Sequence, residues 1–160
     1  MAKIVTFLRL IIFFIFAKAM KPATRILFFL FLFSAGISCK KNDDQIPNVP
    51  VNIYVNTTDP SFTALNSVGG WVNITGGNRG ITVYRKSQTE FMAYERTCSY
   101  KPSDSNARVD VDTNTNYFLE DASCGSKFLI TDGSVQNSPA SFPLKHYTTS
   151  FDGTYVHIYN

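Results

Sequence analysis

Beyond about residue 50, hydrophobic and polar residues alternate in short segments. Alternation with a period of two puts one set of side chains on each face of the chain, which is typical of a half-buried β-strand. No stretch after residue 39 keeps a helical period over three turns. The pattern therefore predicts nine short strands, at residues 51–55, 71–75, 81–84, 91–94, 108–112, 116–120, 128–131, 145–149 and 155–159.

Turn-forming residues separate these segments. Residues 76–80 read Gly-Gly-Asn-Arg-Gly, and Asp-Gly pairs occur at 132–133 and 152–153. Such residues supply the positive φ angles that tight connections require. The run at 76–80 leads into a strand and lacks a following Lys-Ser/Thr, so we predict a hairpin turn there and not a phosphate-binding loop. We expect residues 51–160 to form one all-β domain, an antiparallel β-sandwich or partly open barrel.

The chain before this domain has the organisation of an export signal. Lys21 and Arg25 precede an apolar run at 26–33, and small residues lead from there to Cys39. This arrangement resembles a bacterial lipoprotein signal, although Gly36 stands where such signals carry leucine.

The signal implies where the protein is placed. We predict a signal region over residues 1–38, a lipid anchor on Cys39, a flexible polar tether over 39–50, and a location in the bacterial cell envelope, periplasmic or at the outer membrane. A plain secretory signal with an unmodified Cys39 is the alternative.

Residues 1–19 contain a second apolar run, at 4–17, which is short for a membrane span. Met20 begins a complete signal without this run, so we interpret Met20 as the true start of translation. A two-helix membrane hairpin is the rival interpretation. The charges of Lys18, Lys21 and Arg25 lie between the two runs and would have to be placed at one membrane surface.

The net positive charge of the chain comes from its leader. Residues 1–38 hold five Lys and Arg and no acid, whereas residues 39–160 hold ten Lys and Arg against twelve Asp and Glu, a net charge of about −2. These counts argue against a nucleic-acid binder with a basic face, a multidomain enzyme and a polytopic membrane protein. The large apolar residues that we expect in the core are Trp71, Tyr84, Phe91, Tyr94, Phe118 and Phe128.

Residues suited to catalysis are scarce. The two histidines, His146 and His157, both fall in alternating strands, where a solvent-facing or edge position is the ordinary interpretation. Asp110 and Asp112 alternate on one strand face, which indicates a solvated face and not an acid–base pair. With no Ser-His-Asp set either, we expect no catalytic residues.

Two cysteine-bearing loops and the segments behind them carry the strongest motif. The chain reads Cys-Ser-Tyr at 98–100, then Asp-Ala-Ser-Cys-Gly-Ser-Lys-Phe at 121–128, then Asp-Gly at 132–133, Pro-Ala at 139–140 and Pro-Leu at 143–144. This order resembles the Rieske iron–sulfur domain, whose pattern is Cys-x-His, Cys-x-x-His-Gly-Ser-x-Phe, Asp-Gly, Pro-Ala and Pro-Leu. The resemblance covers residues 65–160 and implies that fold.

The ligand positions of the family pattern are only partly filled. Cys98 matches the first ligand cysteine and Tyr100 the first histidine, while Asp121 matches the second cysteine and Cys124 the second histidine. A Rieske cluster needs two thiolates on one iron and two imidazoles on the other. Because the loops offer two sulfurs, a phenol and a carboxylate, we expect no cluster, no other cofactor and no metal.

The resemblance also implies a role for the cysteines. In the Rieske fold the two loops lie side by side, so Cys98 and Cys124 should lie within bridging distance. Export to an oxidising compartment favours a disulfide, and lipidation of Cys39 leaves an even pair. We expect a Cys98–Cys124 disulfide in place of the cluster and a non-catalytic binding or structural role.

Three alternatives stay open for the cysteine pair. Cys98, Cys124 and Asp121 could hold zinc with one more donor. The pair could be the centre of a thiol–disulfide redox protein. The chain could also carry a [2Fe–2S] cluster with unusual ligation, in which case the family implies electron transfer. The partner that we expect is the membrane, through the lipid anchor, with no nucleic acid; the sequence names no other ligand.

Overall fold

The computed structural model describes residues 44–160, so the signal region and Cys39 lie outside the described residues. Each of the nine predicted strand segments overlaps a strand. The described elements are β1 (Asn52–Asn56), η1 (Pro60–Asn66), β2 (Trp71–Ile74), β3 (Ile81–Arg85), β4 (Phe91–Glu95), β5 (Asp110–Val111), β6 (Phe118–Glu120), β7 (Lys127–Leu129), β8 (Val135–Asn137), β9 (His146–Phe151) and β10 (Tyr155–Tyr159). The sequence pattern did not predict β8 or the short 3₁₀ helix η1.

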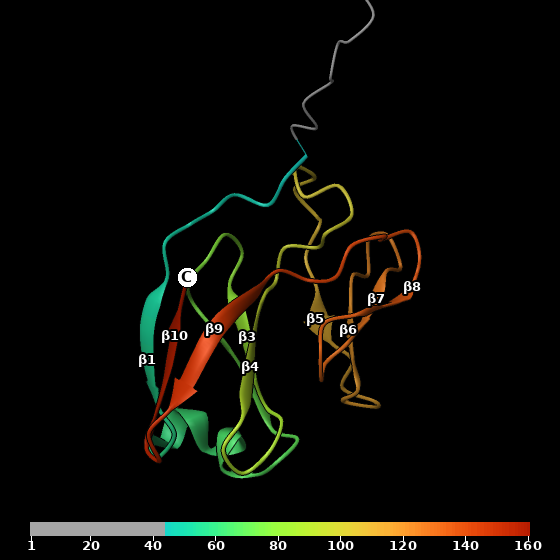
Figure 1. Ribbon diagram of the computed structural model, residues 1–160. Helices are drawn as coiled ribbons and strands as arrows, with labels where there is room; N and C mark the ends of the chain where they lie inside the picture. Colours follow the sequence, from blue (N-terminus) through green and yellow to red (C-terminus); the bar gives the residue numbers. More distant parts are fainter. Residues whose placement is uncertain (1–43) are drawn as a thin grey trace, which may run out of the picture. The chain divides into compact units, whose positions relative to one another are not determined.

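The strands form two antiparallel sheets, which lie beside each other in Figure 1. The large sheet has the order β1-β10-β9-β4-β3-β2, and the small sheet has the order β5-β6-β7-β8. Strands β4 and β9 pair directly, with Ala93 opposite Tyr147 and Tyr94 opposite His146. Residues 96–145, which include the whole small sheet, therefore leave the large sheet and return to it at neighbouring points. The prediction of an all-β antiparallel fold is confirmed.

One hydrophobic core lies on a single face of the large sheet. It combines alternate residues of the strands with Leu65, which η1 contributes. Asp59 caps this helix by accepting the Ser61 N–H at 2.7 Å, and Pro60 follows directly, so the helix begins with a cap and a proline that favour its start. The buried members are Val51, Val55, Leu65, Ile81, Val83, Phe91, Ala93, Tyr147, Val156 and Ile158.

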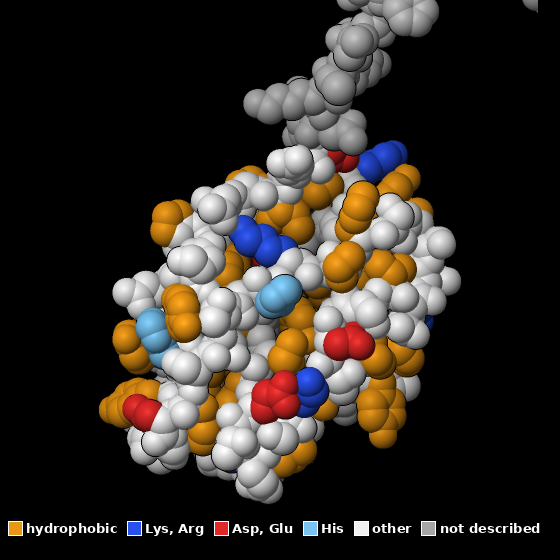
Figure 2. Space-filling view, in the orientation of Figure 1, with side chains coloured by type: hydrophobic (Ala, Val, Ile, Leu, Met, Phe, Trp, Pro, Cys, Tyr) orange, Lys and Arg blue, Asp and Glu red, His pale blue; other side chains and the backbone are white. Residues whose placement is uncertain are grey.

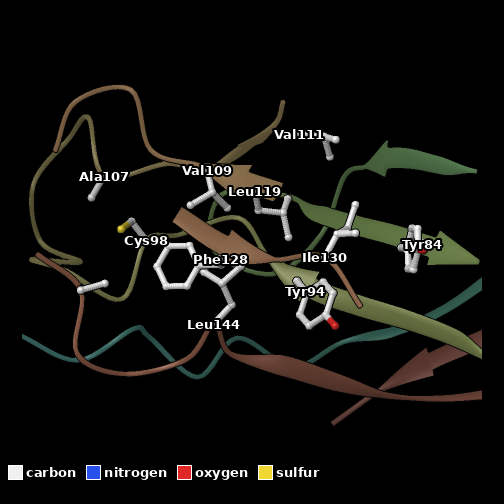
Figure 3. Close-up of a cluster of buried hydrophobic side chains, with 11 residues drawn as sticks. Tyr84, Tyr94, Cys98, Ala107, Val109, Val111, Leu119, Phe128, Ile130 and Leu144 are labelled. Carbon is white, nitrogen blue, oxygen red and sulfur yellow. The ribbon is translucent and has the colours of Figure 1, made fainter. Parts of the chain in front are cut away.

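A second core joins the small sheet to the large one. Tyr84 of β3 and Tyr94 of β4 contribute to it from the opposite face of the large sheet, so these two strands are buried on both faces. Figure 3 shows Cys98 at one end of this core, beside Phe128, with Tyr84 at the other end. The buried members are Tyr84, Tyr94, Cys98, Ala107, Val109, Val111, Leu119, Phe128, Ile130, Ala140 and Leu144.

The expected core is confirmed for four of the six large residues. Those four are buried, whereas the other two are only partly buried. Trp71 packs at the margin of the second core and donates its indole N–H to Asn116 at 3.0 Å. Phe118 is also half-buried, at the start of β6.

The surface carries no concentrated charge on the face that Figure 2 shows, where acidic and basic side chains are scattered among polar and hydrophobic ones. Between residues 44 and 160, no helix is long and apolar enough to cross a bilayer. The end of the predicted tether contacts the domain, since Lys145 Nζ donates to Asn48 Oδ1 at 3.0 Å and to the Pro47 carbonyl at 3.3 Å.

Candidate functional site

The first cysteine loop follows β4 and is held in place by one arginine. The Cys98 N–H donates to the Ala107 carbonyl at 3.1 Å, which closes the loop over residues 98–107. The Arg79 guanidinium donates to four backbone carbonyls of this loop, among them Ser105 at 2.6 Å and Ala107 at 3.1 Å. Because the planar guanidinium presents several donors in a fixed geometry, Arg79 ties the loop to the β2–β3 turn.

That turn is itself fixed by a buried carboxylate. Glu95 is fully buried at the end of β4. Its Oε1 accepts the N–H groups of Arg79 and Thr97, both at 3.0 Å, and its Oε2 accepts the Asn78 N–H at 2.7 Å and the Tyr147 hydroxyl at 2.8 Å. The carboxylate therefore connects the turn, the start of the cysteine loop and β9.

Sequence reasoning singled out neither Glu95 nor Arg79. A signal existed for Glu95, because it continues the period of two that begins with the buried residues Phe91 and Ala93. Gly77 in the turn has a φ of +60°, and a Cβ there would collide with the Glu95 carboxylate. Both the backbone conformation and the lack of space therefore require glycine at this position. The prediction of a hairpin turn at residues 76–80 is confirmed.

The second cysteine loop connects β6 to β7. Its Asp121 is almost completely buried, and Asp121 Oδ1 accepts the N–H of Ser123 at 2.8 Å and that of Cys124 at 3.4 Å. The Gly125 N–H donates to the Asp121 carbonyl at 2.7 Å, and Gly125 has a φ of +77°. This tight turn presents Cys124 toward the first loop.

The two cysteines meet where the loops approach each other. Their Sγ atoms lie 4.0 Å apart, and both are free thiols in the structure. The predicted proximity of Cys98 and Cys124 is confirmed, whereas the bond between them is not formed in this structure and stays a prediction. Ser126 supports the site, because its Oγ lies 3.1 Å from Cys124 Sγ and accepts the Ala140 N–H at 3.0 Å.

Asp121 completes a group of three ligand-type side chains. Ligand atoms of Cys98, Asp121 and Cys124 all lie within 4.8 Å of one another. Asp121 Oδ2 is buried and has no hydrogen-bond partner. A buried acceptor without a partner is unfavourable by about 1–3 kcal/mol. The position of this oxygen therefore lowers the stability of the fold unless something binds to it.

Solvent reaches one side of this group through a cavity of about 340 Å³. Tyr100, which matches a histidine of the family pattern, lines this cavity, and its N–H donates to Cys98 Sγ at 3.5 Å. Lys101 Nζ lies 5.2 Å from the centre of the Tyr100 ring. The cavity is lined by Tyr100, Lys101, Asp104, Ala107, Asp121, Ser123, Cys124 and Pro139.

Burial controls the chemistry of the first thiol. It raises the pKa of Cys98 to about 12, and the neighbouring Asp121 carboxylate adds to the rise, while the Tyr100 N–H opposes it. Cys98 is therefore protonated at neutral pH in the absence of a metal. Since the thiolate is the reactive species, Cys98 is a poor nucleophile in this state.

The donor set does not fit a Rieske cluster. The chain has only two histidines, and the structure places His146 at the start of β9 and His157 in β10, both in the large sheet. His146 is exposed, and His157 stacks between Tyr54 and Tyr159 with ring centroids 4.1 and 4.6 Å away. The cysteine loops therefore have no imidazole for a second iron.

Comparisons with known proteins agree at the level of the fold. No protein-family model and no curated protein matches the chain. The plasma membrane Rieske protein PetC3 from the cyanobacterium Synechocystis PCC 6803 is 20% identical with a TM-score of 0.51, over 68% of this chain and 99% of that chain. The ferredoxin of carbazole 1,9a-dioxygenase from Nocardioides aromaticivorans IC177 is 16% identical with a TM-score of 0.44, over 69% of this chain and 97% of that chain. The likeness to PetC3 shows that the described domain has the fold of Rieske proteins.

Proposed function

We propose that this chain is a lipid-anchored protein of the bacterial cell envelope whose Rieske-like domain holds no [2Fe–2S] cluster. The observation that supports this most is the donor set of the two loops, where Cys98, Asp121 and Cys124 are present and no imidazole is near. Carboxylate or phenolate in place of imidazole would add negative charge to a cluster. A non-catalytic binding or structural role fits these residues better than electron transfer.

In this proposal a Cys98–Cys124 disulfide joins the two loops in place of the cluster. The sulfurs are 4.0 Å apart and must approach by about 2 Å to form the bond. The two thiols lose two protons and two electrons, which a protein disulfide of an envelope thiol oxidase accepts as it is reduced to a dithiol. The cysteines are separated by 26 positions, and closing a loop of that length stabilises the fold by about 3.5 kcal/mol on the chain-entropy model.

A structural disulfide is favoured over a redox-active one. Reactive pairs expose a thiol whose pKa is lowered by a cation or a helix N-terminus. Cys98 is fully buried and its pKa is raised by that burial. The bond would therefore be slow to exchange once it has formed.

The envelope location and the anchor rest on the leader sequence. The charged residues at 21 and 25, the apolar run at 26–33 and Cys39 supply the parts of a lipoprotein signal. Diacylglycerol on Cys39, with a further acyl chain on its amino group, would hold the domain far more strongly than one myristoyl chain does. The polar residues after Cys39 would keep the domain close to the membrane surface.

The absence of a cluster is tested on protein made with the cluster-assembly machinery co-expressed. We expect the purified chain to be colourless, with iron and labile sulfide far below one cluster per molecule. Near-stoichiometric iron and sulfide with a visible Rieske-type spectrum would overturn the proposal and restore electron transfer as the function.

The disulfide is tested separately, by peptide mapping without reductant on protein isolated from the envelope. We expect one linked peptide pair that contains Cys98 and Cys124, which disappears on reduction. A Cys98→Ser variant should unfold at lower denaturant concentration than wild type does, and reductant should lower the midpoint of wild type but not of the variant. Two thiols that stay free in freshly isolated protein would overturn the disulfide.

A further inference from the structure

In the reduced state, the spacing of the two sulfurs fits a metal ion that binds both of them. A disulfide requires about 2.05 Å between the sulfurs. Two thiolates on one tetrahedral zinc ion, each about 2.3 Å from the metal, lie about 3.8 Å apart. Cys98 and Cys124 lie 4.0 Å apart as free thiols, so little movement is needed to place both on one ion.

Asp121 supplies a third ligand that is already oriented. Two backbone N–H groups fix its Oδ1, and this leaves the buried Oδ2 with no partner. The ligand atoms of the three residues lie within 4.8 Å of one another. We propose that Cys98, Cys124 and Asp121, with both thiols reduced, bind one zinc-type divalent cation.

The fourth coordination position faces the cavity. Cys124 and Asp121 both line this space of about 340 Å³, which is open to solvent. A water molecule there would complete a tetrahedron with three protein ligands and one exchangeable position. Binding releases one proton from each thiol to solvent. Two thiolates and one carboxylate then leave a net charge of −1 on the metal site, and Lys101 lines the same cavity.

This inference concerns the same pair that we propose as a disulfide. The metal-bound and disulfide states exclude each other, but either one joins the two loops. The metal would therefore replace the sulfur–sulfur bond whenever the pair is reduced, and the test must separate the two states.

The probe is Co²⁺, followed by competition with Zn²⁺, on the full-length chain in detergent after anaerobic reduction. We expect one Co²⁺ per chain, with the thiolate-to-cobalt charge-transfer band and visible bands of a tetrahedral ion, all displaced by Zn²⁺. Cys98→Ser should weaken the charge-transfer band, because one of the two thiolate ligands is lost, whereas the band of a site formed by Cys39 would be unaffected by this variant.

Asp121→Asn is the decisive variant. Its Oδ1 can still accept both N–H groups, and its NH₂ group replaces an oxygen that also has no hydrogen-bond partner, so the metal-free variant should unfold close to the wild-type temperature. Its affinity for Co²⁺ should fall at least about tenfold, because even the loss of a residue that only supports a ligand costs that much. Glu120→Gln is the control, since Glu120 pairs with Lys127 at 3.0 Å in the small sheet and should leave the affinity unchanged.

A second measurement does not depend on variants. Zn²⁺ should protect the partly exposed Cys124 of the reduced wild-type chain from alkylation, as measured by mass spectrometry. A reduced chain that binds no stoichiometric Co²⁺, or an Asp121→Asn variant with wild-type affinity, would overturn the metal site and leave the disulfide untouched. A chain isolated with two free thiols that binds Co²⁺ through all three residues would support the metal and overturn the disulfide.

Discussion

The replacement of Glu95 by glutamine tests the hydrogen-bond network beneath the cysteine loop. The carboxylate of Glu95 is fully buried and accepts from five donors, two of them at Oε2. Glutamine keeps the shape of the side chain but has only one oxygen. The NH₂ group of the glutamine must therefore take the place of the other oxygen, where it faces the donors that bind that oxygen in wild type.

The structure indicates which contact is lost. With the NH₂ group in the place of Oε2, the Tyr147 hydroxyl can turn and accept, whereas the Asn78 N–H faces a second donor. A hydrogen bond to a charged group contributes about 1.5–3 kcal/mol, and a buried donor without a partner is unfavourable by about 1–3 kcal/mol. Glutamine is neutral, so the variant does not have to bury a charge, and this gain offsets part of the loss. We expect Glu95→Gln to lower the free energy of unfolding by about 2–3 kcal/mol at neutral pH.

The same residue predicts a dependence on pH. Burial alone would raise the pKa of Glu95, but hydrogen bonds from Asn78, Arg79, Tyr147 and Thr97 hold it below its ordinary value of 4.5. Because the folded-state pKa is the lower one, the carboxylate contributes stability that is fully present above about pH 4.5 and is lost as the pH falls through the folded value. The difference between wild type and Glu95→Gln should therefore shrink in acid.

The assay is urea unfolding of the full-length chain, followed by the fluorescence of its single tryptophan, at pH 7 and at several values below 4.5. Glu90→Gln is the matched control, since Glu90 forms only an exposed pair with Lys86 at 2.9 Å and should change stability by less than about 0.5 kcal/mol. A Glu95→Gln variant as stable as this control at pH 7 would refute the reasoning. So would a difference from wild type that does not depend on pH.

Three further variants test other parts of the structure. Phe128→Ala should lower the free energy of unfolding by about 3–5 kcal/mol, because Phe128 is fully buried in the second core; a melting temperature like that of wild type would show that the residue does not support this core. Arg79→Lys should speed hydrogen exchange over residues 98–107 and alkylation of Cys98 in the reduced protein, since lysine cannot bind four carbonyls at once; unchanged rates would mean that the loop holds its shape alone. Cys39→Ala should abolish incorporation of labelled fatty acid and release the domain from the membrane; unchanged incorporation would contradict the lipid anchor.

The sequence predicts the strands well because most of them are half-buried and alternate. The two elements that it missed give weak patterns. β8 is three residues long with one apolar side chain, and η1 spans seven residues with a kink at Phe62, too short for a helical period to appear. The start of η1 was nevertheless marked in the sequence, where Asp59 and Pro60 form a capping residue and a first-turn proline.

The candidate site was predictable only through the family resemblance. Spacing along the chain does not bring Cys98 to Cys124, because their approach depends on how the small sheet folds back. The unpaired Asp121 Oδ2 could not be foreseen either, since it arises from the orientation that the turn imposes on the carboxylate. Likewise, no sequence pattern distinguishes Arg79 from an ordinary charged turn residue, because its partners are backbone carbonyls more than twenty positions away.

Because β4 pairs directly with β9, the segment between them, residues 96–145, is a cassette, meaning an insertion whose two ends lie on neighbouring strands. The strands that flank it lie side by side, and they pair with each other and with the large sheet without any strand of the segment between them. Mutations that leave the second core intact can therefore remove ligands, add cysteines or lengthen a loop inside residues 96–145 while the large sheet keeps its own strand pairing. Such an arrangement allows the ligand set of the two loops to change while the strands of the large sheet stay paired. It also lets an engineer exchange the cassette for one with a complete set of ligands, joined at the ends of these two strands.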